Sequence, residues 1–365
     1  MKLVSRILLI MLALALAGCA YYDPMMQLEA TTPMLEADQL AELQRRAKTP
    51  EALGIGVVRQ GGFTWFRGVN EVSVSGTVTA RLSRVETAHP FQPGGRYRVP
   101  VVLATVNGHG GVRVMLDSGS NQSLCGYGLA RGLELTPIAG LNAMNSHGIG
   151  GSVDTLPSVA DSLRIGGVEI RKLVTMINPD VQALRVREFW GTSRVFLMGV
   201  NIFRGLSYLT IDSPRGFVVF GVGEAYRPDK TSEFVADAPL SWQNDLPCIP
   251  LKIDKKGPFA CLVDTGGDYG LLLPRARASG LGYWKPGEGK VEPSTGVAGA
   301  GLSVTYDVKT AHVGAMAVLN IPSRTIVVGP EPAGGATLIG NHVLRRYRIT
   351  FDFRNQRFWM ERRES

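Results

Sequence analysis

The hydrophobic pattern of the chain divides into an apolar leader, one amphipathic stretch and a long series of short β-like runs. Residues 7–17 are wholly apolar and follow a short basic segment at 1–6. Residues 35–47 carry apolar side chains at positions 35, 37, 40, 43 and 47, which is the spacing of one face of a helix. From Gly54 onward, short runs rich in valine, threonine and aromatic residues alternate with glycine and proline. These runs predict a mostly-β protein preceded by a leader and a short helix.

The leader has the features of a secretory signal that ends at a cysteine. Its apolar run is too short to span a bilayer as a helix, which takes about 20 residues. Residues 16–19 read Leu-Ala-Gly-Cys and resemble the lipobox of bacterial lipoproteins. This predicts a signal peptide over 1–18, lipid (palmitate) on Cys19 and a lipid-anchored tether over 19–37. Because Ala20 follows the cysteine, the resemblance implies an outer-membrane lipoprotein facing the periplasm of a diderm bacterium. The alternative is an ordinary signal peptide with a chance cysteine.

Two long stretches of the β-like region repeat each other. Each begins with a predicted hairpin whose second strand ends on Asp-Ser-Gly or Asp-Thr-Gly, at Asp117 and Asp264. Three features then follow in the same order in each copy: a glycine-rich segment, an apolar string ending in glycine, and a closing strand pair. They lie at 148–151, 196–199 and 208–220 in one copy, and at 296–301, 337–340 and 347–360 in the other. The shared order predicts a duplicated fold, with one copy over 96–225, the other over 240–365, and an N-terminal extension of a helix plus strands over 38–95.

The two aspartates predict a shared catalytic site. A single Asp-Ser/Thr-Gly is weak evidence, because these residues also favour plain turns. Two homologous loops that meet across a local twofold axis would bring Asp117 and Asp264 within hydrogen-bonding range, where the pair shares one proton. The ionised carboxyl can then take a proton from a water while the protonated carboxyl polarises a peptide carbonyl.

The neighbours of the aspartates predict how the two loops are held. Gly119 and Gly266 allow each backbone to approach closely. The hydroxyls of Ser118 and Thr265 can link the loops by hydrogen bonds to the opposite backbone.

The next position in each loop predicts an asymmetric pair. Ser120 has a hydroxyl that can donate to a carboxylate, whereas its counterpart Gly267 has no side chain. A hydrogen bond to the charged form favours ionisation. We therefore expect Asp117 to be the more acidic partner and Asp264 to hold the shared proton.

These motifs resemble those of the retropepsin-like aspartic proteases, in the bacterial form that carries two lobes in one chain as pepsin does. The resemblance covers 96–222 and 245–363. It implies a mostly-β, two-lobed acid-protease (pepsin/retropepsin-like) β-barrel fold, no cofactor, and endopeptidase activity on periplasmic or envelope polypeptides bound in extended conformation. It also implies flaps at the glycine-rich segments and a substrate-binding aspartate; the residues concerned are Gly148, Ile149, Gly150, Gly151, Asp268, Gly299, Ala300 and Gly301.

The chain departs from the family pattern at three places. Asn121 stands in the first copy where the family uses an aspartate near the substrate backbone. Val200 and Asn341 replace the arginine that commonly follows the apolar string. The ion pair that this arginine makes in the family therefore does not carry over from the sequence.

Composition and motifs argue against several other functions. The net charge of +8 is spread along the chain with no dense basic run, so we expect no nucleic-acid partner. The five histidines are scattered and form no His-Glu-x-x-His, so we expect no metal. The chain has no Gly-x-Ser-x-Gly elbow, Walker A string or dinucleotide fingerprint.

The sequence leaves some alternatives open. Both aspartate loops lie in one chain, so we expect an active monomer; a catalytically silent lipoprotein that binds or scaffolds extended peptides is the alternative function. Residues 35–90 are either a spacer with added sheet edges or a cap over the cleft.

The cysteines leave one further alternative open. Pairing of Ile253 with Pro258 in the predicted hairpin would put Cys248 and Cys261 on one face, diagonally placed. That is a poor geometry for a disulfide, but it does not exclude one.

Overall fold

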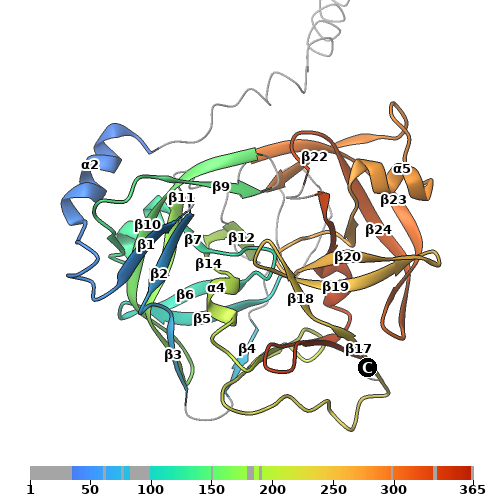
Figure 1. Ribbon diagram of the computed structural model, residues 1–365, viewed down its shortest axis with the longest axis horizontal. Helices are drawn as coiled ribbons and strands as arrows, with labels where there is room; N and C mark the ends of the chain where they lie inside the picture. Colours follow the sequence, from blue (N-terminus) through green and yellow to red (C-terminus); the bar gives the residue numbers. More distant parts are fainter. Residues whose placement is uncertain are drawn as a thin grey trace, which may run out of the picture.

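The computed structural model describes residues 35–60, 63–74, 78–82, 99–148, 151–178, 185–188, 191–296, 299–331 and 335–362. The signal peptide and Cys19 lie outside these ranges, as do Ile149 and Gly150. No helix within the described ranges is long and apolar enough to cross a membrane. The described chain is mostly β, as the sequence predicted, and its strands form several sheets (Figure 1).

The first repeat, from β5 to β16, is built on a nine-stranded sheet that also takes in β3 of the extension. Its strands are β3 (Glu71–Val74), β5 (Val101–Val106), β6 (His109–Leu116), β7 (Ser123–Gly126), β8 (Thr136–Pro137), β9 (Met144–Gly148), β10 (Gly151–Ile165), β11 (Val168–Asn178) and β14 (Phe196–Met198). Two short helices, α3 (Tyr127–Gly132) and α4 (Val200–Phe203), follow β7 and β14. A separate hairpin joins β12 (Arg185–Glu188) to β13 (Gly191–Arg194).

The second repeat, from β19 to β27, has an eight-stranded sheet of the same design, to which β18 adds an edge. Its strands are β18 (Ser241–Gln243), β19 (Leu246–Ile253), β20 (Lys256–Asp264), β21 (Leu271–Leu272), β22 (Val291–Gly296), β23 (Gly299–Val313), β24 (Met316–Val328) and β25 (Thr337–Gly340). Helices α5 (Arg275–Leu281) and α6 (Asn341–Leu344) follow β21 and β25. In both repeats the strand before the aspartate runs parallel to the apolar string: β6 to β14 and β20 to β25.

A third, six-stranded sheet joins the repeats. Its order is β17 (Phe234–Pro239), β27 (Arg357–Arg362), β26 (Arg348–Asp352), β15 (Tyr208–Asp212), β16 (Phe217–Gly221) and β4 (Val78–Arg81). The closing strands β15 and β26 pair antiparallel with Thr210 directly opposite Thr350, and their hydroxyls are 2.8 Å apart. Such a self-matched pair marks a local twofold relation between the two copies.

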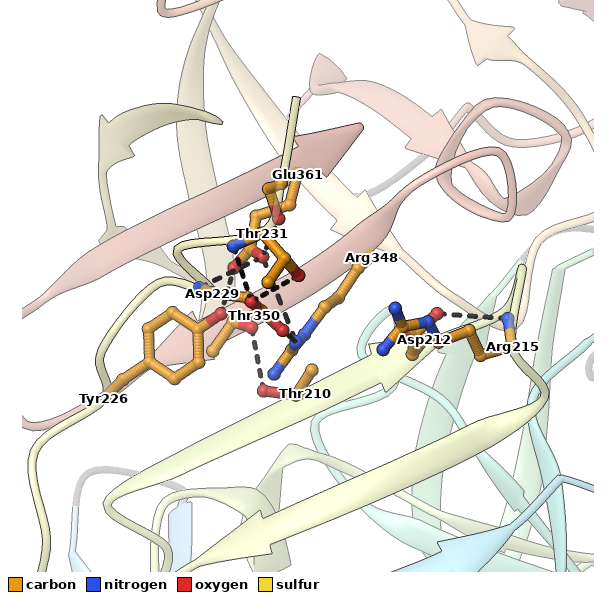
Figure 2. A network of polar contacts seen from close by, with 10 residues as sticks. Thr210, Asp212, Arg215, Tyr226, Asp229, Thr231, Arg348, Thr350 and Glu361 are labelled. Atoms are coloured by element: carbon orange, nitrogen blue, oxygen red, sulfur yellow. Dashed lines mark hydrogen bonds and ion pairs between the residues drawn. The ribbon is translucent and has the colours of Figure 1, made fainter. Parts of the chain in front are cut away.

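A network of buried polar side chains lies at this junction (Figure 2). The fully buried Glu361 carboxylate accepts hydrogen bonds from the hydroxyls of Tyr226 and Ser232. Arg348 donates to Asp229 at 3.2 Å. A buried carboxylate is tolerated only when it is paired and hydrogen-bonded, and here several donors meet it. The network therefore helps to hold the junction between the repeats.

The N-terminal extension packs on the outer flank of the first repeat (Figure 1). Helix α2 (Ala37–Arg46) buries Leu43 completely in the core. The hairpin of β1 (Gly56–Gln60) and β2 (Phe63–Arg67) follows, after which β3 pairs with β11 and β4 with β16. Strands β3 and β4 of the extension thus add edges to two sheets, and a cap over the cleft stays a prediction. The exact domain boundaries stay a prediction.

The register predicted for the second aspartate hairpin was wrong. Ile253 pairs with Lys256, not with Pro258. Asp254 and Lys255 alone form the turn, both with positive φ (47° and 70°). Two such residues give the tight two-residue turn whose twist suits a hairpin, which shortens the connection.

This register settles the cysteine alternative. Cys261 lies opposite Ile249, so Cys248 points to the other face of the sheet. Both thiols are buried and free, as is that of Cys125. A disulfide between Cys248 and Cys261 is therefore not formed in this fold.

Candidate active site

The two aspartates end equivalent strands, and the fold brings their loops together. Asp117 follows β6 and Asp264 ends β20; each is only 8% exposed. The two carboxyls lie close enough for their charges to act on each other. The sequence placed these two residues in one site, and the structure does the same.

The loops are locked by a reciprocal set of hydrogen bonds. The amide of Ser118 donates to Thr265 Oγ1 (3.0 Å), whose hydroxyl donates to the carbonyl of Leu116 (2.7 Å). The amide of Thr265 donates to Ser118 Oγ (3.1 Å), whose hydroxyl donates to the carbonyl of Val263 (2.6 Å). Both side chains are fully buried. The cross-links expected from the two hydroxyls are present, and they fix the aspartates relative to each other.

The glycines after these residues are required by close packing. A Cβ on Gly119 would lie 2.4 Å from Oδ1 of Asp264. A Cβ on Gly266 would lie 2.5 Å from Cγ of Asp117. Each glycine therefore provides the space for the opposite carboxyl, as the sequence argument required.

The apolar strings pack beneath the loops. The amide of Asp117 donates to the carbonyl of Met198 (3.0 Å), and the amide of Val200 donates to that of Ser120 (2.8 Å). In the second repeat the amide of the buried Asn341 donates to the carbonyl of Gly267 (2.8 Å). These backbone bonds position both loops without the arginine that the family commonly carries at this point.

The two carboxyls receive different numbers of donors. Oδ1 of Asp117 accepts the amide of Gly119 at 2.8 Å. Oδ1 of Asp264 accepts the amides of Gly266 (3.0 Å) and Gly267 (2.9 Å), and its Oδ2 accepts the hydroxyl of Tyr269.

This difference separates the two pKa values. Burial raises the pKa of both carboxyls. For Asp117 the charge of Asp264 adds to this, and its pKa lies well above the ordinary value. For Asp264 the hydrogen bonds from Tyr269 and from the backbone act in the opposite direction. The donors around Asp264 therefore favour it as the ionised partner and leave Asp117 as the carrier of the shared proton.

The premise of the predicted asymmetry was wrong. The hydroxyl of Ser120 donates to the carbonyl of Gln122 (2.7 Å) and not to a carboxylate. Serine readily makes such a bond to its own backbone two residues away. The donor that sequence reasoning missed is Tyr269. Its signal is a tyrosine two residues after Gly267, at the place where the loop lacks a hydroxyl.

Asp268 has an ion partner from another strand. Nη2 of Arg324, on β24, lies 3.8 Å from its Oδ1. Arg324 is 7% exposed, and its guanidinium also lies over the ring of Tyr269, 5.8 Å from the centroid. A buried arginine thus lies beside the second loop, although Asn341 and not an arginine directly follows the apolar string.

Hairpins are present at both predicted flaps. Gly148 pairs with Gly151 in the β9–β10 hairpin, and the second hairpin pairs Ala300 and Gly301 of β23 with β22 next to the closing Gly296–Gly299 pair. Strands β10 and β23 contact each other, and the hairpins approach across the top of Figure 1. Whether they close over a substrate stays a prediction. Ile149 and Gly150 lie outside the described residues.

The described residues contain no cluster of three or more His, Cys, Asp or Glu side chains placed to hold a metal ion. The site is therefore described by its two carboxyls and the donors around them.

Comparison with protein families places part of the chain. Residues 102–201 match the family model described as aspartyl protease. The match runs from β5 to α4, so it contains Asp117 and leaves Asp264 outside. It supports an aspartic-protease-like family for the chain. No curated protein matches the sequence.

Proposed function

We propose that the chain is an aspartic endopeptidase that hydrolyses peptide bonds with a water activated by Asp117 and Asp264. The observation that carries the proposal is the reciprocal lock of Ser118 and Thr265, which holds two buried, electrostatically coupled carboxyls at the meeting point of duplicated loops. Two carboxyls that differ in pKa are the arrangement needed for paired acid and base roles. The family match over the first loop supports the same chemistry.

The proton positions define the role of each carboxyl. Ionised Asp264 accepts a proton from water, and the water oxygen attacks the peptide carbonyl carbon. Asp117 gives its proton to the carbonyl oxygen, which leaves a neutral diol. Asp264 then passes its proton to the amide nitrogen, the C–N bond breaks, and a diol hydroxyl returns a proton to Asp117. The dyad ends in its starting state, so it needs no cofactor.

The substrate we propose is a polypeptide in extended conformation, lying beneath the β9–β10 and β22–β23 hairpins. This polypeptide belongs to a periplasmic or envelope protein, because we also propose that Cys19 is lipidated and tethers the enzyme to the outer membrane. The localisation rests on residues 16–19 of the sequence alone. Because one chain supplies both aspartates, we propose that the monomer is active.

The test is cleavage of a peptide library by the full chain purified in detergent, with Asp117→Asn and Asp264→Asn beside it. We expect cleavage by the parent chain and none by either variant. Asp161→Asn, at an exposed position on β10, serves as the matched control and should cleave normally. Undiminished cleavage by either active-site variant would refute the dyad. Binding of peptides without any cleavage would favour the silent peptide-binding alternative.

A further inference from the structure

The two aspartate loops differ at two equivalent positions, and the two differences belong together. The third residue after the aspartate is Ser120 in one loop and Gly267 in the other, and the fifth is Gln122 or Tyr269. Only the second loop aims a side-chain hydroxyl at its aspartate, because the Ser120 hydroxyl is used by the Gln122 carbonyl.

The room for the Tyr269 ring comes from two glycines. A Cβ on Gly267 would lie 2.6 Å from Cε1 of the ring and 2.6 Å from Oδ2 of Asp264. A Cβ on Gly340 would lie 2.6 Å from Cδ2 of the ring. The backbone of Tyr269 is also fixed, since its carbonyl accepts the amide of His342 (3.1 Å). The tyrosine is therefore built into the loop and does not swing freely.

The hydroxyl of Tyr269 stays protonated in this environment. Burial and the adjacent Asp264 carboxyl raise the pKa of Tyr269 well above its ordinary value. The charged and titratable groups that face the pair are Asp117 on the first loop, Asp268 on the second and Arg324 on β24. The phenol therefore acts only as a donor to Asp264.

From this geometry we infer that Tyr269 is a positioning residue that keeps Asp264 the ionised partner and leaves the shared proton on Asp117. The inference rests on the proposed protease function. The hydroxyl touches the carboxylate that accepts the water proton, whereas among the described residues no side-chain hydroxyl donates to Asp117. It therefore assigns the base role to Asp264 and the acid role to Asp117 in every turnover.

The test is the pH dependence of kcat/KM for Tyr269→Phe in the full chain. The phenyl ring preserves the packing and removes only the donor. We expect the acidic limb to move upward by about one to two pH units, because a hydrogen bond to a charged group is lost. An acidic limb that stays in place would overturn the inference, whatever happens to kcat.

The matched control is Tyr226→Phe. This tyrosine also donates its hydroxyl to a buried carboxylate, Glu361, but it does so in the six-stranded sheet (Figure 2). The control should lower stability and leave the acidic limb where it is. If the limb moves equally in Tyr226→Phe, general loosening accounts for the shift and the inference fails.

A second measurement does not depend on turnover. The melting temperature of Tyr269→Phe should fall further below that of the parent chain at pH 7 than at pH 3, where both dyad carboxyls are protonated. An equal loss at both pH values would refute the role of Tyr269. If the parent chain cleaves nothing, the proposed function fails, while this comparison still decides whether Tyr269 holds Asp264 ionised.

Discussion

Replacing Thr265 with valine should destabilise the molecule more than its small change in shape suggests. Valine has the same size and branching but lacks the hydroxyl, which accepts from the amide of Ser118 and donates to the carbonyl of Leu116. Both groups then lose their partner in a fully buried place. An unsatisfied buried group costs about 1–3 kcal/mol, so the two together should lower the free energy of unfolding by about 2–6 kcal/mol. That is a large share of a typical stability of about 5–15 kcal/mol.

The assay is urea denaturation of the full chain, with two companion variants. Thr210→Val removes another buried hydroxyl near the local twofold axis, but there the partner is the hydroxyl of Thr350, which can turn to a new acceptor. This control should cost about 0.5–1.5 kcal/mol, the value of one ordinary hydrogen bond. Thr265→Ser keeps the hydroxyl, matches Ser118 of the first loop and should retain nearly all stability and cleavage.

One outcome would refute the reasoning. If Thr265→Val costs no more than Thr210→Val, the hydroxyls do not hold the aspartate loops together. A loss of cleavage in Thr265→Ser equal to that in Thr265→Val would point the same way, since the serine variant restores the donor and the acceptor.

Three further outcomes are expected. Gly267→Ala should reduce kcat/KM at least tenfold because its Cβ would crowd the dyad and the tyrosine ring; Gly280→Ala, where a Cβ meets nothing within 4 Å, is the control. Asp117→Asn should raise the melting temperature at pH 7 and not at pH 3. A carboxyl whose pKa is raised in the folded state destabilises the folded state once the pH exceeds the pKa of the unfolded chain. Calorimetry at both pH values decides this. Cys248 and Cys261 should react with a maleimide only after the protein unfolds, and no reducing agent should be needed beforehand. A protein mass lower by two hydrogens before reduction would contradict the free thiols.

The architecture could be predicted because its signals are local and occur twice. Alternating and wholly apolar runs predict the strands. The repeated order of Asp-Ser/Thr-Gly, glycine-rich segment and apolar string predicts that two copies of one fold pair with each other. The helix at α2 followed from the spacing of its apolar residues, of which Leu43 is fully buried. The meeting of Asp117 and Asp264 followed from the duplication.

The charge distribution in the site could not be predicted, because it depends on side-chain direction. Nothing in the sequence tells whether the hydroxyl of Ser120 turns to a carboxylate or to its own backbone. The ion pair of Asp268 depends on Arg324, which reaches the loop only through the pairing of β21 with β24. The register of the second hairpin depended on two non-glycine residues, Asp254 and Lys255, adopting positive φ. The Arg324 ion pair is decided by a contact between distant segments, the hairpin register by a rare backbone state, and the Ser120 hydroxyl by a choice between two nearby acceptors.

The duplication within one chain has a consequence for the chemistry. In a symmetric dimer of identical subunits both aspartate loops have the same sequence, so a donor added to one carboxyl is added to the other as well. Here Asp117 and Asp264 are encoded separately, and Tyr269 occurs in one loop only. The hydrogen bond from Tyr269 can then lower the pKa of one carboxyl while the charge of that carboxyl raises the pKa of its neighbour. A chain that carries both loops can therefore fix which carboxyl is the acid and which is the base. In a symmetric dimer the two carboxyls stay equivalent until an asymmetric substrate binds.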